Sequence, residues 1–491
     1  MATVPALPEI VPNIVGSEER LAARSETLDN LNPATGGLVN RLTASSAEDV
    51  DAAVAAAKAA FPAWAGQSPV ARGNHLFALC QAMEDNADRL AEIVAEETGK
   101  AFKDARGEVG GAIQCGRFFA GEGTRLFGRT MPSGQVGKYN MTVRQPIGVA
   151  GLIIAANTPI ANVAWKIFPA MICGNGVVLK AAETAPNTAY AVGKLAIEAG
   201  LPAGVLNVLQ GDGKNAGMPL VEHEDTLVIS FTGSSAAGQW IAEACAKRMK
   251  KVSLELGGKN PLVVCDDADI ERAVHWVCLS VYSNAGQRCA SASRILIQDG
   301  VYDRFRDVLI EATKAVKIGI EDGAMCGPVI TERALSLMTA AVDEAVANGA
   351  KLLAGGNRAD EPGLADGFYM RPTILENVPY DAPISETELF GPIGVLYRFK
   401  TYDEALAVAN DSPYGLTACI HTKDVDRAMH FAHHVSAGVA VINAGTYGSE
   451  PHMPFGGLRK SGNGTREPGT EALDIYSNLK DIYIVTETDG L

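Results

Sequence analysis

From position 146 onward, the sequence alternates between short apolar runs and segments whose apolar residues have helical spacing. The runs lie at 148–155, 176–180, 205–209, 227–231 and 252–256. Strands that are apolar on both faces are typical of a parallel sheet with helices on both sides. The segment 187–199, with Asn187 as a candidate N-cap and Gly200 as a stop, predicts one such helix. The pattern therefore predicts a doubly wound α/β domain of the nucleotide-binding type.

A second alternation begins after Lys259. Its apolar runs lie at 261–265, 294–298, 393–399, 417–421 and 438–443. Because 491 residues are too many for one ordinary core, a second α/β domain is the simplest interpretation. The first third of the chain is instead helical in pattern, with start signals at Ser46 and at Ser68-Pro69.

Composition excludes several classes of function. A formal net charge of -15 disfavours binding to nucleic acid or to anionic lipid. The longest apolar run, at 149–156, is far too short to cross a membrane, and no Lys or Arg precedes Arg20, as a basic leader would require. The nine cysteines form no Cys-x-x-Cys pair, and the histidines show no ligand spacing with them. We therefore expect no metal site, reduced thiols and a cytoplasmic location.

Two glycine-rich stretches contain the residues best suited to chemistry. Cys289 lies in Asn-Ala-Gly-Gln-Arg-Cys-Ala (284–290), where Arg288 and a helix starting at this bend would both favour the nucleophilic thiolate. Glu255 lies in Leu-Glu-Leu-Gly-Gly-Lys-Asn-Pro (254–261), at the end of an apolar strand that would raise its proton affinity toward that of a general base. The alternatives are a small buried apolar side chain for the cysteine and a charged strand rim for the glutamate.

These stretches, together with Asn157 and Glu-Leu-Phe-Gly-Pro (388–392), resemble the aldehyde dehydrogenase superfamily over almost the whole chain. The resemblance implies an α/β fold with a Rossmann-type cofactor domain and a second, catalytic α/β domain. It places the cofactor domain at 1–127 and 147–257, the catalytic domain at 258–472, and a small oligomerisation β-flap at 128–146 and 473–491. The flap contains an alternating segment at 481–487, which would be an available edge strand. The resemblance further implies that the protein is a homodimer or a homotetramer.

The resemblance also implies a covalent reaction that needs no metal. Cys289 would add to an aldehyde to give a thiohemiacetal, and the amide of Asn157 with the backbone N–H of Cys289 would stabilise the oxyanion. After hydride transfer to NAD or NADP, Glu255 would activate the water that hydrolyses the thioester to a carboxylate. As an alternative, an asparagine before Thr-Pro is a common turn residue.

For the cofactor, the sequence favours NAD and leaves NADP possible. Lys180 and Glu183 end a strand where the adenosine ribose would lie, and a carboxylate there repels a 2′-phosphate, although the lysine could attract one. The segment 231–238 reads as strand, Gly turn and helix start, which suits a pyrophosphate, with Ser234 facing a phosphate. The full set of cofactor residues implied by the resemblance is Ile154, Ala155, Ala156, Lys180, Glu183, Gly213, Gly233, Ser234, Gly238, Leu256, Gly257, Glu388 and Phe390.

The substrate pocket is expected to include Trp165, Arg288 and Phe455. Arg288 and the segment Gly-Asn-Gly-Thr-Arg-Glu (462–467) are similar to the branch that acts on 2-oxoglutaric semialdehyde, which predicts an acidic aldehyde. Arg288 could equally be a structural ion-pair partner, and a pocket without Arg or Lys would argue against the acidic aldehyde. The chain keeps only Asn157 and Pro159 of the family's usual Pro-Trp-Asn-Phe-Pro, and Thr465 reads as an insertion.

Three other functions compete with this interpretation. A semialdehyde dehydrogenase that transfers its thioester to coenzyme A would lack the glutamate, so Glu255 argues against it. A thiol hydrolase or acyltransferase using Cys289 without a nicotinamide is opposed by the cofactor motifs. A non-catalytic descendant of the fold is the third alternative, because fold alone does not establish activity, and it is opposed by the joint presence of Cys289, Glu255 and Asn157.

Overall fold

The apolar runs between 148 and 256 form the parallel part of a seven-stranded sheet in the computed structural model, which describes residues 3–487. The parallel strands are, in spatial order, β12 (Lys251–Glu255), β11 (Thr226–Thr232), β8 (Val149–Ile153), β9 (Gly176–Lys180) and β10 (Leu206–Leu209). Two short antiparallel strands continue the sheet beyond β10, namely β2 (Asn13–Val15) and β3 (Glu18–Arg20). The predicted parallel sheet is confirmed.

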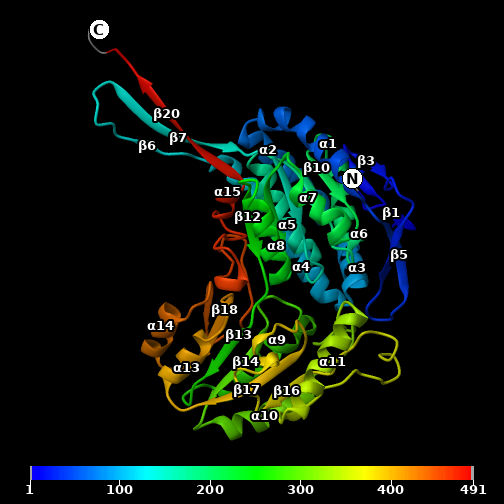
Figure 1. Cartoon of the computed structure of the whole chain (residues 1–491), viewed down its shortest axis with the longest axis vertical. Helices are drawn as coiled ribbons and strands as arrows, with labels where there is room; N and C mark the ends of the chain where they lie inside the picture. Colours follow the sequence, from blue (N-terminus) through cyan, green and yellow to red (C-terminus); the bar gives the residue numbers. More distant parts are fainter. Residues whose placement is uncertain (1–2, 488–491) are drawn as a thin grey trace.

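Helices cover both faces of this sheet, which lies in the upper lobe of Figure 1. In β8, Val149 packs into one apolar core and Ala150 into the other, as expected for a strand buried on both sides. One face carries α1 (Ala47–Ala65), α7 (Met218–Glu222) and α8 (Ser235–Ala246). The other face carries α2 (Pro69–Asp85), α3 (Ala87–Thr98), α4 (Phe102–Gly121), α5 (Pro159–Ile172) and α6 (Pro186–Glu198).

The predicted helix starts are correct in two cases and wrong in one. Ser68 caps α2 through a hydrogen bond from the Ala71 N–H, and the Asp49 carboxylate accepts from the Ser46 N–H at the start of α1. Asn187 does not cap α6, because that helix begins one residue earlier, at Pro186. The Asn187 side chain instead accepts a hydrogen bond from Asn40 at 2.9 Å, which ties α6 to the N-terminal strands.

The second alternation forms a separate seven-stranded sheet in the lower lobe of Figure 1. Its strands are, in spatial order, β15 (Lys351–Ala354), β16 (Thr373–Glu376), β17 (Ile393–Phe399), β14 (Ala292–Gln298), β13 (Asn260–Val264), β18 (Thr417–His421) and β19 (Val439–Ile442), all parallel except β15. The helices of this lobe are α9 (Ile270–Tyr282), α10 (Tyr302–Lys314), α11 (Glu332–Ala347), α12 (Pro383–Glu386), α13 (Tyr402–Asn410) and α14 (Val425–His434). Only residues 256–259 separate β12 of the upper sheet from β13 of the lower one.

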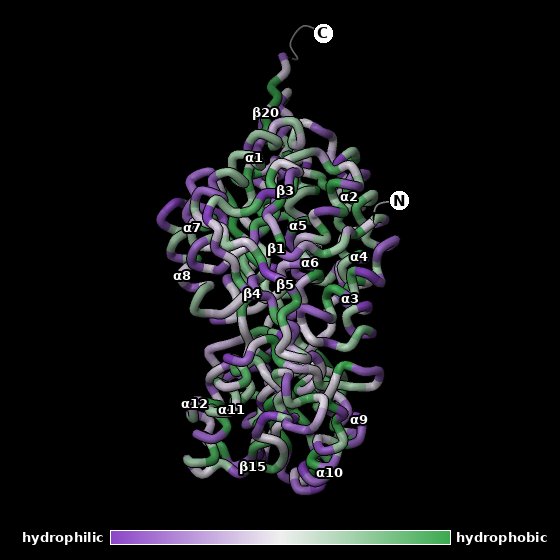
Figure 2. The backbone as a smooth tube through the Cα atoms, turned by 90° about the vertical axis from the view of Figure 1, so that its right-hand side faces the viewer, coloured by the Kyte–Doolittle hydropathy of each residue, from purple (hydrophilic) through white to green (hydrophobic). Residues whose placement is uncertain are grey.

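Two three-stranded sheets complete the structure. One packs on the upper lobe and consists of β1 (Ile10–Val11), β5 (Leu38–Thr43) and β4 (Thr27–Leu31). The other is an arm that projects from the upper lobe, built from β20 (Ser477–Val485), β7 (Lys138–Pro146) and β6 (Thr130–Met131). Figure 2 shows β20 extending beyond the rest of the molecule. The strand predicted as an available edge pairs antiparallel with β7 along its length. Positions 488–491 of the predicted flap lie outside the described residues.

The strand order fixes where a ligand can enter the upper sheet. β8 lies between β9, which follows it in the chain, and β11, which the chain reaches only after β10. Open α/β sheets bind ligands in the crevice at the carboxyl ends of strands where the order reverses in this way. The segments that leave β8 and β11 at this crevice begin at Ile154 and at Gly233.

Candidate functional site

The catalytic candidates from three distant stretches face one cavity of about 340 Å³ at this crevice. Cys289, Glu255 and Asn157 all contribute to its lining. The cavity also receives Trp165 and Phe455 of the predicted substrate pocket. The cofactor candidates that line it are Ala155, Gly233, Ser234, Leu256, Gly257, Glu388 and Phe390. The structure therefore brings together all three catalytic candidates and most of the expected nicotinamide side of the cofactor site.

Cys289 lies between a short 3-10 helix, η3 (Ser283–Gly286), and β14. It is the only cysteine of the nine that is not buried. Desolvation of the sulfur, together with the carboxylates of Glu255 and Glu388, raises the pKa of its thiol to about 12. The expectation that Arg288 and a helix start would favour the thiolate is wrong, because no helix begins at Cys289 and the dominant charges around the sulfur are negative.

The backbone of the bend that presents Cys289 is fixed by contacts with neighbouring segments. The Asn260 amide donates to the carbonyl oxygens of Cys289 at 2.7 Å and Ser291 at 2.8 Å. Upstream, Gly286 has a φ of +67°, and a Cβ at this position would overlap the backbone of Gly391. Only glycine fits there, which explains the glycine in the motif.

Glu255 is the last residue of β12, and its side chain is buried. Within residues 3–487, neither of its carboxylate oxygens has a hydrogen-bond partner. Burial raises the pKa of Glu255 well above its ordinary value, the nearby Glu467 carboxylate raises it further, and Lys166 and Arg466 oppose the shift. A buried carboxyl with no partner beside a reactive side chain is characteristic of a proton-transfer group. The predicted rise in proton affinity is confirmed.

A buried polar network behind Glu255 was not predicted from the sequence. Lys166 in α5 and Glu467 form an ion pair with Nζ–Oε2 at 2.8 Å, and both side chains are fully buried. Ser230 accepts from Lys166 at 2.6 Å and donates to Glu467 at 2.6 Å, while Ser253 donates to the same carboxylate at 2.9 Å. Lys166 is the only charged residue of α5, which is otherwise apolar except for Asn162, and this was the signal that could have revealed the network.

Asn157 is held in place from two directions. Its side-chain amide donates to the Gln287 carbonyl oxygen at 2.9 Å, which leaves the second amide hydrogen for the cavity. Its own carbonyl oxygen accepts from the Lys100 ammonium at 2.9 Å. Lys100 is in turn paired with Glu108, which accepts from the Ile160 N–H at the start of α5. Lys100 and Glu108 therefore position Asn157, and neither role was predicted from the sequence.

Glu388 and Phe390 reach the cavity from the segment that precedes β17. The Glu388 carboxylate accepts from the Gly258 N–H at 2.9 Å, and burial raises its pKa to about 7. A Cβ at Gly257 would overlap this carboxylate. Glycine at position 257 therefore allows the two lobes to approach each other. Phe390 has a φ of +57°, which is uncommon for a bulky residue and turns its ring into the cavity.

Six cofactor candidates lie outside this cavity, and three of them lie at the neighbouring strand ends. Lys180 ends β9 and is buried, which lowers its pKa, while the carboxylates of Glu183 and Asp212 oppose that shift. Glu183 is exposed. Gly213 begins a π-helical turn at 213–217, directly after Asp212. A lysine with two carboxylates nearby can bind hydroxyl groups, and Asp212 is an addition to the predicted set.

Of the other cofactor candidates, Ser234 lies in the cavity lining, and Gly238, Ile154 and Ala156 pack outside it. Ser234 caps α8 by accepting from the Ala237 N–H at 3.3 Å, so the amino end of this helix opens on the cavity. Gly238, in the first turn of α8, lets the helix pack against the side chain of Leu256. Ile154 and Ala156 are not part of the lining; their side chains pack into the upper core.

Arg288 does not line the cavity, contrary to the prediction of a substrate-binding arginine. Its guanidinium lies over the Tyr447 ring, 4.6 Å from the centroid, and donates to the Ser283 hydroxyl. Among the described residues, the lining includes no Lys or Arg. Trp165 and Phe455 instead give it an aromatic wall, with ring centroids 5.5 Å apart. A pocket lining without Arg or Lys argues against an acidic aldehyde as the substrate.

Within residues 3–487, no three His, Cys, Asp or Glu side chains are grouped as a metal ion would require. No helix there is both long and apolar enough to traverse a bilayer. All nine cysteines are free thiols.

Comparison with known proteins agrees with the fold. The model of the aldehyde dehydrogenase family matches residues 21–482. The chain is 37% identical to the alpha-ketoglutaric semialdehyde dehydrogenase of Bacillus subtilis, covering 92% of this chain and 93% of the relative. It is 38% identical to the NADP(+) succinate-semialdehyde dehydrogenase of Escherichia coli, covering 95% and 96%. It is also 38% identical to the glutarate-semialdehyde dehydrogenase of Pseudomonas putida, covering 94% and 95%.

Solved structures show the same architecture. Betaine aldehyde dehydrogenase of Staphylococcus aureus in complex with NAD+ superposes with a TM-score of 0.94 at 31% identity, covering 96% of this chain and 94% of that chain. An aldehyde dehydrogenase of Brucella melitensis superposes with a TM-score of 0.93 at 35% identity, covering 97% and 98%.

The fold, with its dinucleotide-type sheet opening on a cysteine and a buried carboxyl, is that of an oxidoreductase with an NAD-binding architecture. The family match covers most of the chain, and each of these relatives exceeds 30% identity over more than nine-tenths of it. The chain belongs to the aldehyde dehydrogenase family.

Proposed function

We propose that this enzyme oxidises an aldehyde to its carboxylate by covalent catalysis at Cys289, with NAD or NADP as the hydride acceptor. The observation that carries the proposal is the meeting of a thiol, an amide and a buried, unpaired carboxyl in one cavity. The rival without a nicotinamide is disfavoured because the same cavity extends to the amino end of α8 at Ser234, which suits a pyrophosphate. When bound, the oxidised nicotinamide supplies a positive charge and accepts the hydride.

The protein's own groups then have distinct roles. The Cys289 sulfur attacks the carbonyl carbon as its proton passes to solvent water, a step made costly by the carboxylates that raise its pKa. The carbonyl oxygen gains negative charge and receives hydrogen bonds from the free Asn157 amide hydrogen and from the Cys289 N–H. The acyl group remains on sulfur until a water molecule, deprotonated by Glu255, releases the carboxylate.

The oxyanion role of Asn157 predicts a loss in rate with little change in stability. Asn157→Ala removes one donor to the developing charge, and we expect kcat to fall about 10²–10³-fold. Stopped-flow measurement of NADH formation tests this. Asn357→Ala, at an exposed asparagine in the lower lobe, is the matched control and should leave the rate unchanged. An Asn157→Ala enzyme with the wild-type rate would remove Asn157 from the mechanism.

We propose NAD as the preferred cofactor because Glu183 places a carboxylate beside Lys180. The relatives differ on this point, since the E. coli enzyme is named for NADP(+) and the S. aureus structure holds NAD+. Glu183→Ala should raise the NADP-to-NAD ratio of kcat/KM about tenfold, which corresponds to about 1.4 kcal/mol of repulsion removed. Glu224→Ala, at an exposed glutamate of the same lobe, is the control. An unchanged ratio would show that Glu183 does not select the cofactor.

For the substrate, the cavity favours an aldehyde with an apolar or aromatic body, because Trp165 and Phe455 line it and no basic side chain does among the described residues. An acidic semialdehyde is the second candidate, favoured by the names of the three relatives at 37–38% identity. A panel of hexanal, benzaldehyde and succinic semialdehyde, with NAD and NADP in parallel, separates the two. A kcat/KM at least tenfold higher for the acidic aldehyde would favour the second candidate.

The arm supports the proposal of a homodimer or homotetramer. β20 exposes the apolar side chains of Leu479, Tyr483, Ile484 and Val485. Apolar side chains exposed together on an edge strand are typical of a surface that contacts another chain. Sedimentation analysis should give a mass of two or four times 51.5 kDa, and a mass of 51.5 kDa would contradict the proposal. The free thiols support the proposed cytoplasmic location, since oxidising compartments favour disulfides.

A further inference from the structure

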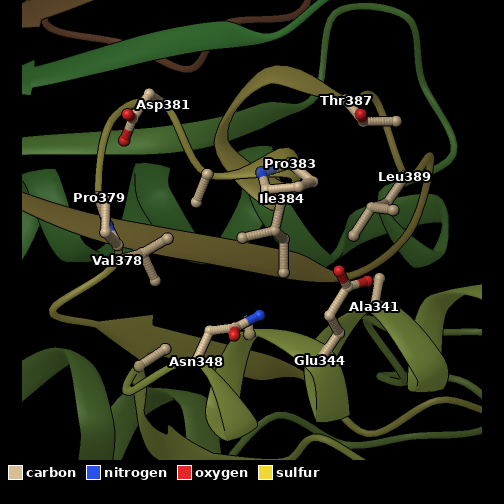
Figure 3. A pocket seen from close by; sticks show the side chains of 13 residues that line it. Ala341, Glu344, Asn348, Val378, Pro379, Asp381, Pro383, Ile384, Thr387 and Leu389 are labelled. Atoms are coloured by element: carbon tan, nitrogen blue, oxygen red, sulfur yellow. The ribbon is translucent and has the colours of Figure 1, made fainter.

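A second cavity of about 430 Å³ lies in the lower lobe, between α11 and the segment 378–389. Figure 3 shows Val378, Ile384 and Leu389 directed into it from that segment, with α11 forming the opposite wall. Ala341 and Ala345 keep the α11 wall low, so the groove is open along the helix. It shares no lining residue with the cavity that contains Cys289.

The charges on this groove have one sign. Its only charged lining residues are Glu344 on α11 and Asp381 near the start of the facing segment, and both are exposed. Within residues 3–487, neither carboxylate has a hydrogen bond or an ion pair, and the lining includes no Lys, Arg or His. Figure 3 shows the Glu344 carboxylate at the end of the groove near Leu389, and Asp381 toward the opposite end. Asn348 and Thr387 add polar groups at the rim.

We propose that this groove binds a small amphipathic cation, namely an organic ammonium ion with a short alkyl body. The apolar floor would gain about 25 cal/mol for each Å² of alkyl surface that it removes from water. The unpaired carboxylates of Glu344 and Asp381 select the positive head group, because a cation at the rim gains charge-assisted contacts that no basic residue already satisfies. An alkyl anion of the same size would meet only negative charge, in a chain whose formal net charge is -15.

The groove also contacts the segment that reaches the catalytic cavity. Leu389 lines the groove, while its neighbours Glu388 and Phe390 line the cavity of Cys289. A ligand that packs against Leu389 therefore acts on the backbone that orients both neighbours. If the two sites are linked, a cation in the groove changes the affinity for the dinucleotide, and the dinucleotide changes the affinity for the cation by the same factor. This linkage rests on the proposed function, whereas the binding of the cation does not.

The experiment is calorimetric titration of the full-length enzyme with hexyltrimethylammonium, which cannot condense with aldehydes. We expect saturable binding, with hexanol and hexanoate at least about tenfold weaker, since a tenfold change corresponds to about 1.4 kcal/mol. Glu344→Gln combined with Asp381→Asn should weaken binding of the cation at least about tenfold. Asp343→Asn, at an exposed carboxylate on the same helix outside the groove, is the matched control and should bind as the wild type does.

Binding at the aromatic wall of the catalytic cavity is the main competing explanation. Ala341→Phe should block the groove and abolish binding, whereas Trp165→Ala should leave it intact. Loss of binding in Trp165→Ala, full binding in the Glu344→Gln and Asp381→Asn double variant, or no binding by the wild type would each overturn the proposal. NAD titrated with and without the cation tests the linkage, for which we expect a change in Kd of about threefold or more. Cation binding without NAD binding would refute the proposed function and leave the groove intact.

Discussion

Cys289→Ala is expected to abolish aldehyde oxidation, with kcat/KM reduced by more than about 10⁴-fold. Among the described residues, Cys289 contributes the only thiol to the cavity that Asn157 and Glu255 also line. No other cysteine can replace it, because the remaining eight are buried. Initial rates of NADH formation, with NAD affinity measured separately by fluorescence, distinguish loss of chemistry from loss of the cofactor. Wild-type rates in the variant would end the covalent mechanism.

The ionisation of Cys289 gives this prediction an independent readout. Since its pKa is raised to about 12 in the ligand-free enzyme, the thiol is protonated at neutral pH. Alkylation by iodoacetamide should therefore become faster by about tenfold for each unit of pH between 7 and 9. The Cys289→Ala variant serves as the control and should remain unlabelled under native conditions. A labelling rate that does not depend on pH in this range would show that the thiol is already ionised.

Glu255→Gln should separate the two halves of the reaction. The amide cannot deprotonate water, so steady turnover is expected to fall about 10²–10⁴-fold. Formation of the thioester does not need that base, and rapid mixing should still give a burst of about one NADH per site. Glu271→Gln, at an exposed glutamate at the start of α9, is the matched control. Undiminished turnover would refute Glu255 as the base, and a coenzyme A-dependent release of product would favour the acyl-transferring alternative.

The raised pKa of Glu255 adds a pH dependence with a defined sign. The buried carboxyl is neutral in the folded enzyme at pH values where it is ionised in the unfolded chain, so its contribution to stability is present below about pH 4.5 and is lost as the pH rises through the folded-state pKa. Glutamine avoids this loss, and Glu255→Gln should melt at a higher temperature than the wild type at pH 8. Turnover by the wild type should increase with pH as the base ionises, and the variant should lack that increase.

Local sequence was informative where one property dominated a segment. Runs such as 176–179 and 261–264 are apolar at every position, so they could be only strands buried on both faces or buried helix, and their length favoured strands. Ser68 followed by Pro69 marked the start of α2 for an equally local reason. Asn187 failed as a cap because α6 begins at Pro186, and its side chain accepts a hydrogen bond from Asn40, which lies 147 positions away.

The residues around the reactive groups were harder to predict, because their effect depends on distance in space. Arg288 is adjacent to Cys289 in sequence, yet its charge is directed onto the Tyr447 ring, while Glu255 and Glu388 from other segments dominate the field at the sulfur. Lys100 and Lys166 hold groups of the site through contacts across 57 and 301 positions. Contacts between residues so far apart leave no periodic pattern in the sequence.

The sequence by itself determined the two α/β sheets and the identities of the thiol, amide and carboxyl, since strand burial and side-chain chemistry are properties of short segments. Only the tertiary structure decided their protonation and the character of the pocket. Burial and the sum of nearby charges set a pKa, and both arise from elements that meet only when the chain folds. The same physical reason explains why the groove beside α11, with its two unpaired carboxylates, has no counterpart in any sequence motif.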